Sequence, residues 1–89
     1  MTKTTTTISN KLGLHARASA KFVETVERFD ATALVEKDGE RVAGNSIMGL
    51  LMLTAPRGSS ITVTTVGPQA AALMAALSAL VADFFGEGM

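Results

Sequence analysis

The sequence predicts an α+β fold with the element order βαββαβα, in which a layer of helices covers one face of a sheet. Two segments carry apolar residues at helical spacing, near both ends of the chain: 16–29 and 70–85. Other segments are rich in threonine and valine or alternate in polarity, which is typical of strands. This local pattern leaves the strand order open, because ferredoxin-like and other split arrangements fit it equally.

The N-terminal third predicts a strand followed by a helix. Thr4–Ile8 is threonine-rich and favours the first strand, and Asn10–Gly13 is a polar turn that closes on glycine. From Ala16 to Phe29 the apolar side chains recur at spacings of four and three. This spacing predicts an amphipathic helix whose inner face comprises Ala18, Phe22, Val26 and Phe29.

The dipeptide Asp38-Gly39 predicts a tight hairpin between the strands Asp30–Glu36 and Glu40–Ala43. Such a turn needs positive φ, which glycine adopts without steric cost.

A short helix is expected at 47–53, with Asn45 or Ser46 as its N-cap. In this helix Leu50 and Leu53 share one face. A helix this short cannot bury every side, so the remaining apolar residues are either core or an exposed apolar patch beside the candidate site: Ile47, Met48, Leu51 and Met52.

The C-terminal third predicts a loop, a strand and a helix. The loop Thr54–Ser59 leads into the strand Ile61–Val66, with Ile61 and Val63 on one face. Gly67-Pro68 ends that strand and begins a helix, since proline suits the first helical turn. One apolar stripe of this helix is expected in the core: Leu73, Leu77, Leu80 and Phe84.

Length and charge restrict the class of protein. The 89 residues predict a single domain spanning 1–89, and 47% hydrophobic residues indicate a folded chain. Eight basic residues balance eight acidic ones. Because non-specific binding to nucleic acid and to anionic membranes depends on clustered positive charge, neither is expected.

The chain has no cysteine and one histidine. This excludes a disulfide scaffold, a thiolate zinc site, a cysteine nucleophile and a histidine-rich metal site. The threonine-rich start lacks the apolar core of a signal peptide, and Ala70–Phe85 is too short and too weakly apolar to span a bilayer. We therefore expect a cytoplasmic chain without a metal or cofactor. A monomer is the expected state of assembly, although none of these observations determines it.

The sole histidine, His15, lies where the first loop ends and the first helix begins. The N-terminal turn of a helix has unpaired N–H groups and a partial positive charge, so it attracts anions and disfavours a protonated imidazole. A neutral imidazole is a nucleophile, and Arg17 can bind the oxygens of an anion with two donors. These residues suit transient phosphoryl transfer. The alternative is that His15 is a solvated helix cap and Arg17 a surface charge.

Two motifs in register carry a family resemblance. Gly13-Leu14-His15-Ala16-Arg17, followed by Asn45-Ser46-Ile47-Met48-Gly49-Leu50, resembles the HPr phosphocarriers of the bacterial phosphoenolpyruvate-dependent phosphotransferase system. The resemblance covers about residues 4–85 and implies an open-faced sandwich with a four-stranded antiparallel sheet and three helices on one face. Three stretches are similar to the nitrogen-related branch of the family: Asn10–Gly13, Leu50–Leu53 and Gly67–Gln69.

The resemblance implies that His15 accepts a phosphoryl group from enzyme I and passes it to an EIIA-type domain. Arg17 then stabilises the phosphate, which the backbone N–H groups of Ala16 and Arg17 cap. The implied docking surface lies on two helices and comprises Ala16, Arg17, Ala20, Ile47, Met48 and Leu51. The chain is then a carrier in a relay, not a stand-alone enzyme.

Ser46 matches the serine that HPr kinase/phosphorylase modifies in some bacteria. From the residues alone, a serine before an apolar helical run is an N-cap. The two roles are compatible, because a phosphate at a helix N-terminus is electrostatically tolerated.

The chain departs from the family at Ala18, where many members have proline. Proline would fix φ in the first helical turn, whereas alanine is a good helix former. We expect the helix to form and His15 to remain the acceptor, and the rigidity of the His15 loop stays open.

Two other functions are weighed against the carrier. A regulatory binding module of the same fold would act by docking, with phosphorylation at His15 or Ser46 as a switch. An unrelated α+β interaction domain would need neither motif. The presence of both His15 and Arg17 favours the carrier. A free-standing enzyme is disfavoured, because no carboxylate pair or catalytic triad can form around one histidine.

Overall fold

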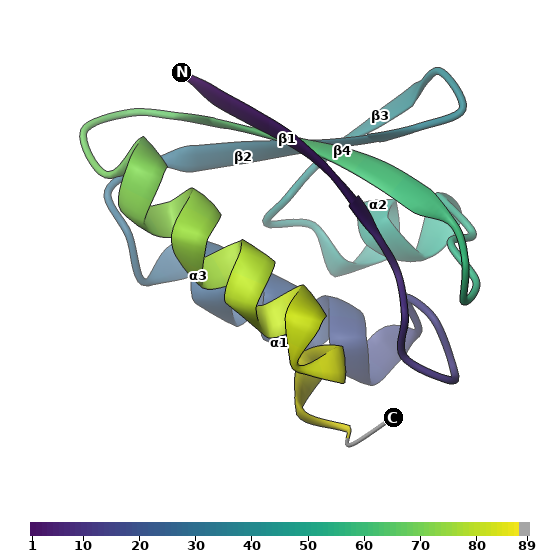
Figure 1. Ribbon diagram of the computed structural model, residues 1–89. Coiled ribbons are helices and arrows are strands. Elements are labelled where there is room, and N and C mark those ends of the chain that lie inside the picture. Colours follow the sequence, from purple (N-terminus) through teal and green to yellow (C-terminus); the bar gives the residue numbers. More distant parts are fainter. Residues whose placement is uncertain (88–89) are drawn as a thin grey trace.

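The computed structural model describes residues 1–87 and has the predicted βαββαβα order. The elements are β1 (Thr2–Thr7), α1 (Ala16–Glu27), β2 (Thr32–Lys37), β3 (Glu40–Ala43), α2 (Ile47–Met52), β4 (Ser60–Val66), α3 (Ala70–Ala82) and the short turn η1 (Phe84–Gly86). The strands form one antiparallel sheet in the order β1-β4-β2-β3. The helices lie on one side of this sheet and leave its other face open (Figure 1).

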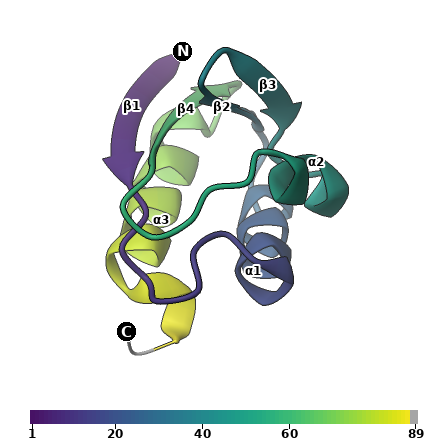
Figure 2. The ribbon, with the colours of Figure 1, turned by 90° about the vertical axis from the view of Figure 1, so that its right-hand side faces the viewer.

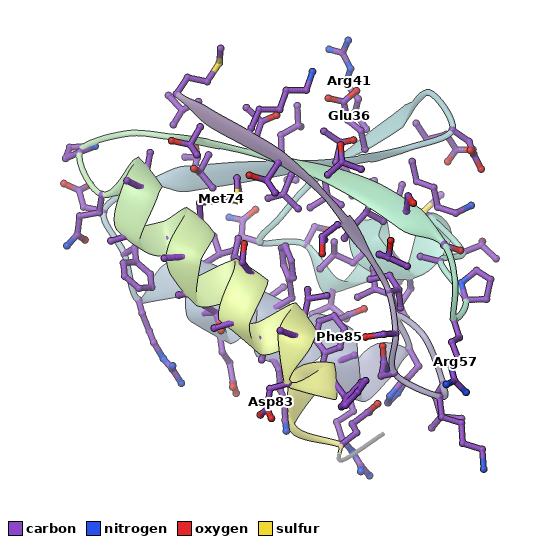
Figure 3. The ribbon with its side chains drawn as sticks, viewed as in Figure 1. Glu36, Arg41, Arg57, Met74, Asp83 and Phe85 are labelled. Carbon is purple, nitrogen blue, oxygen red and sulfur yellow. The ribbon has the colours of Figure 1, made fainter. Side chains whose placement is uncertain are left out.

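The predicted hairpin joins β2 to β3, which is one edge strand of the sheet. Asp38 and Gly39 both have positive φ, 50° and 84°, as a two-residue hairpin turn requires. The open face is polar, with the hydroxyls of Thr5 and Thr62 3.1 Å apart across β1 and β4. Glu36 and Arg41 also lie on this face (Figure 3).

The core lies between the sheet and the helices. The sheet contributes alternate residues of its central strands, such as Val35 and Ile61, and the helices contribute Phe22, Leu50 and Leu73. Figure 2 shows α3 and α1 beneath the sheet, with α2 beside α1. No helix within residues 1–87 is long and apolar enough to cross a membrane.

Several predicted boundaries were wrong by a short distance. β1 begins at Thr2 and ends before Ile8, although the N–H of Ile8 still donates to the carbonyl of Ser59 at 2.8 Å. α1 ends at Glu27 because Arg28 caps it, so Phe29 is only half-buried. The other shifts concern β2, which begins at Thr32, α2, which ends at Met52, and β4, which begins at Ser60.

Pro68 does not begin the last helix, contrary to the prediction. Gln69 is held outside the helix by two hydrogen bonds with Asp30: its N–H donates to the Asp30 carbonyl at 3.1 Å, and its side-chain Oε1 accepts from the Asp30 N–H at 2.6 Å. The helix therefore starts at Ala70, and Pro68 lies in the turn before it.

The predicted core stripe of the last helix is right in its first half. Leu73 and Leu77 are buried, whereas Leu80 and Phe84 are half-buried. Leu80 lies within the helix and packs against the core while remaining partly exposed. The chain leaves the helix after Ala82, so helical spacing does not decide the direction of Phe84. Phe85 is fully buried instead (Figure 3).

Candidate functional site

His15 is the N-cap of α1. Its backbone is extended (φ −86°, ψ −176°), and its carbonyl accepts the first helical hydrogen bond from Ser19 at 2.8 Å. The ring nitrogen Nδ1 accepts a hydrogen bond from the backbone N–H of Arg17 at 3.3 Å. A nitrogen that accepts must carry a lone pair, so the proton of the neutral ring lies on Nε2.

The loop before His15 is fixed by its backbone. Gly13 has φ +68°, and its carbonyl accepts from the His15 N–H at 3.0 Å. The next residue, Leu14, donates its N–H to the carbonyl of Ala55 at 2.8 Å. The buried side chain of Asn10 also donates to the Gly13 carbonyl, at 2.7 Å. These bonds place the loop at the start of α1.

Glu87 completes the site and was not predicted. Its Oε2 is hydrogen-bonded to Nε2 of His15, and its Oε1 accepts from Nδ2 of Asn10 at 2.8 Å. The side chain of Glu87 is 11% exposed and that of His15 27% exposed. Glu87 lies far from His15 in the sequence, in a segment without regular periodicity, so no local signal points to this contact.

The surroundings of Glu87 favour its charged form. Burial raises the pKa of this carboxyl, but the hydrogen bonds from Asn10 and His15, together with the electrostatic effects of His15 and Arg17, outweigh burial and hold the pKa below its ordinary value of 4.5. The folded chain therefore binds this proton less readily than the unfolded chain. Glu87 contributes to stability above about pH 4.5, and this contribution is lost as the pH falls through the lowered value.

Open space borders the site on two sides. A hollow of about 460 Å³ is lined by Arg17 and Glu87 with their neighbours Lys11, Leu12 and Gly86. A second hollow of about 220 Å³ lies against His15 and is lined by Leu12, Leu14, Thr54, Ala55 and Pro56. A reacting group can therefore reach His15 and Arg17 from outside the molecule.

The predicted docking residues lie on two helices that contact each other, α1 and α2. Ala16 and Arg17 are exposed in the first turn of α1, and Ala20 is half-buried one turn later. On α2, Leu50 is fully buried, and the residues off its face are exposed: Ile47 (42%), Met48 (70%), Leu51 (37%) and Met52 (67%). Ile47, Met48, Leu51 and Met52 therefore form an exposed apolar patch, whereas Leu50 belongs to the core.

Ser46, rather than Asn45, is the N-cap of α2. Its hydroxyl oxygen accepts a hydrogen bond from the N–H of Gly49 at 3.0 Å. It is half-buried and precedes the exposed Ile47 and Met48. Ala18 is fully buried in an intact first helix, so the prediction that α1 forms without proline is confirmed.

The chemistry of the site rests on one imidazole, one guanidinium and one carboxylate. Within residues 1–87 no three histidine, aspartate or glutamate side chains cluster closely enough to hold a metal ion. The arrangement presents a nucleophilic ring nitrogen at the N-terminal turn of a helix, where an anion is favoured.

Comparisons with known proteins agree on one family. The family described as "PTS HPr component phosphorylation site" matches residues 2–83. The chain is 49% identical to the phosphocarrier protein HPr of Neisseria meningitidis over 88 residues, 99% of each chain. It is 42% identical to the phosphocarrier protein NPr of Escherichia coli over 86 residues, 96% of each chain.

Solved structures of the same kind are similar in fold. The crystal structure of HPr-C-His from Thermoanaerobacter tengcongensis superposes with a TM-score of 0.95 at 37% identity and full coverage of both chains. The fold, the position of His15 and these relatives lead to the same conclusion: the chain belongs to the HPr phosphocarrier family of the phosphotransferase system.

Proposed function

We propose that this chain is a histidine phosphocarrier that accepts a phosphoryl group from phosphorylated enzyme I on His15 and passes it to an EIIA-type domain. The observation that carries the proposal is the position of His15 Nδ1, which faces the N–H of Arg17 at 3.3 Å in the first turn of α1. Nδ1 is then the acceptor atom, because Nε2 is engaged by Glu87.

The first turn of α1 suits a phosphoryl group on Nδ1. The backbone N–H groups of Ala16 and Arg17 belong to the helix end that carries a partial positive charge. The guanidinium of Arg17 supplies paired donors for two phosphate oxygens. The exposed positions of Ala16 and Arg17 leave both groups available to a partner's phosphohistidine.

We propose that enzyme I and EIIA-type domains bind the same surface, made by Ala16, Arg17 and Ala20 of α1 and by Ile47, Met48 and Leu51 of α2. The apolar side chains of α2 would be covered in either complex. Methionine adapts its shape easily, which suits a surface that must fit more than one partner. The carrier would act in the cytoplasm as a monomer and as one domain.

One experiment tests the relay. The chain is incubated with phosphoenolpyruvate, enzyme I and, in parallel, EIIA proteins of the sugar and nitrogen-related branches. We expect phosphorylation of His15 followed by transfer to one of these acceptors, which also identifies the branch. Phosphorylation without onward transfer to any EIIA protein would favour the regulatory binding module instead.

Arg17→Lys is expected to slow phosphoryl transfer about ten-fold or more. Lysine keeps the charge but lacks the planar fork of donors, and one charge-assisted hydrogen bond contributes about 1.5–3 kcal/mol. Rapid-quench measurement of transfer from enzyme I checks the prediction, with the exposed Arg57→Lys as a matched control. Wild-type rates in the Arg17 variant would remove the bidentate role.

Ser46→Asp is expected to weaken binding to enzyme I while leaving the fold intact. A fixed charge beside Ile47 and Met48 must lose water when a partner covers this patch. The same charge is favourable at the N-terminus of α2, so the melting temperature should be unchanged or slightly higher. Calorimetric binding and thermal unfolding measure the two effects. Unchanged binding would leave Ser46 as a helix cap only. We propose that HPr kinase/phosphorylase is the partner that introduces such a charge, by phosphorylating Ser46.

A further inference from the structure

The chain after α3 adopts a left-handed backbone conformation at three successive residues, of which only the last is glycine. Phe84, Phe85 and Gly86 have φ of 52°, 54° and 77°. Residues with a Cβ rarely adopt this conformation, because their Cβ comes too close to the following carbonyl oxygen. Other contacts must therefore hold the segment 83–87 in place.

Two contacts hold this C-terminal segment. The side chain of Phe85 is fully buried in the core, whereas Asp83 points outward (Figure 3). Lys21 of α1 donates from Nζ to the carbonyl of Phe85 at 2.9 Å. The segment is thus fastened on both sides, and it leads directly to Glu87.

Both carboxylate oxygens of Glu87 have hydrogen-bond partners. Asn10, which is fully buried, donates from one amide nitrogen both to the Gly13 carbonyl and to Oε1 of Glu87. Because Oε1 is fixed in this way, Oε2 points to Nε2 of His15. Each carboxylate oxygen has one partner, and both partners belong to the loop and helix start that form the site.

We propose that Glu87 is a positioning residue of the phosphoryl-transfer site: it holds the proton on Nε2 of His15 and orients the ring so that the Nδ1 lone pair faces the first turn of α1. The Arg17 N–H, which donates to Nδ1, also requires the ring proton to be on Nε2, because a proton on Nδ1 would place two donors face to face. Glu87 and Arg17 therefore fix the ring from its two nitrogens.

This assignment rests on the proposed function for its effect on the reaction. When the phosphohistidine of enzyme I is the donor, the Nδ1 lone pair attacks phosphorus, the new N–P bond forms and the donor's N–P bond breaks, with its electron pair returning to the donor ring. His15 keeps its proton on Nε2 throughout. The ring gains positive charge as Nδ1 is phosphorylated, and the Glu87 carboxylate stabilises that charge through Nε2–H.

Two acceptor oxygens are needed at residue 87, one for Asn10 and one for His15. Replacing the carboxylate with an amide tests this need, because an amide has only one oxygen. In Glu87→Gln the single side-chain oxygen cannot accept from both Asn10 and His15 in the same geometry. If it keeps Asn10, its NH₂ group faces Nε2 as a second donor. The ring then loses its anchor, while the backbone of the buried Phe85 need not move.

The first readout does not depend on phosphoryl transfer. In unphosphorylated wild-type protein, ¹⁵N NMR of the imidazole should show a hydrogen-bonded, slowly exchanging Nε2–H. This signal should be lost in Glu87→Gln and kept in Glu40→Gln, a matched change at an exposed carboxylate on the β2–β3 hairpin. Persistence of the signal in Glu87→Gln would overturn the assignment.

The second readout is the rate of phosphorylation by enzyme I. We expect a loss of about ten-fold in kcat for Glu87→Gln, by analogy with metal-bound histidines, where loss of the carboxylate partner costs about 10–100-fold in affinity or activity. KM for the carrier should change less than kcat, because Glu87 is not one of the proposed docking residues, although it lines the same hollow as Arg17. A wild-type kcat, or a rise in KM alone, would contradict a positioning role.

Lys21→Met tests the same contact from the other side of the segment. It removes the bond to the Phe85 carbonyl without touching His15, and should weaken the Nε2–H signal and kcat together, while Lys21→Arg should restore both. If wild-type protein accepts no phosphoryl group, the proposed function fails, and the NMR signal still decides whether Glu87 fixes the ring.

Discussion

Replacing His15 with alanine is expected to abolish acid-labile phosphorylation of the chain by enzyme I. The chain has no second histidine that could accept the group. The fold should persist, because His15 is a partly exposed helix cap whose loss costs about 1 kcal/mol. Mass spectrometry before and after acid treatment measures the phosphate, and thermal unfolding measures the stability.

The contrary outcome is equally clear for this variant. Acid-labile phosphate on a folded His15→Ala protein would place the acceptor elsewhere and remove the proposed relay. Phosphate that survives acid would instead indicate a serine or threonine, with Ser46 the first to examine. The Arg17→Lys variant, which keeps His15, distinguishes a slowed reaction from an absent one.

Gly13→Ala is expected to destabilise the chain by roughly 2–5 kcal/mol, the second large effect. An alanine in the left-handed region costs about 1–2 kcal/mol, and overpacking a tight site adds about 1–3 kcal/mol. A Cβ at Gly13 would lie 2.6 Å from the carbonyl oxygen of Ala55 and 2.8 Å from Cα of Pro56. Both are backbone atoms, so the loop must move, and His15 moves with it.

Gly39→Ala is the matched control for this prediction. Gly39 also has positive φ, but nothing lies within 4 Å of the position of its Cβ. This variant should lose only the conformational cost and transfer phosphate normally. Chemical denaturation compares the two free energies of unfolding. Equal losses would show that the contact with Ala55 and Pro56 does not constrain the loop.

Local pattern predicted the helices and the hairpin, and it left two readings open for the apolar residues of α2 outside the face of Leu50: core or exposed patch. In α2, Leu50 and Leu53 share one face of the helix, and this face is buried against the core. The apolar residues outside this face are exposed: Ile47, Met48 and Leu51. The position of His15 followed in the same way, because it depends only on where α1 begins. These features are decided within a few residues of sequence.

Features that depend on distant contacts could not be predicted. The place of β4 between β1 and β2 has no signature in any single strand. The contact of Glu87 with His15 requires Phe84 and Phe85 to adopt positive φ, against their intrinsic preference. The burial of Phe85 and the hydrogen bond from Lys21 to its carbonyl hold that conformation, and both depend on the whole fold.

The central place of β4 bears on how the chain folds during its synthesis. β1 pairs only with β4, in a register that runs from Thr2 opposite Thr65 to Thr7 opposite Ser60. The first strand to be synthesised therefore has no partner until the last strand has been made. Until β4 emerges, only the β2–β3 hairpin can close locally, and every other sheet contact bears a large loop-closure entropy. Threonine gives β1 a strand preference without an apolar surface. The nascent strand can therefore stay exposed on the ribosome with little tendency to pair with other chains.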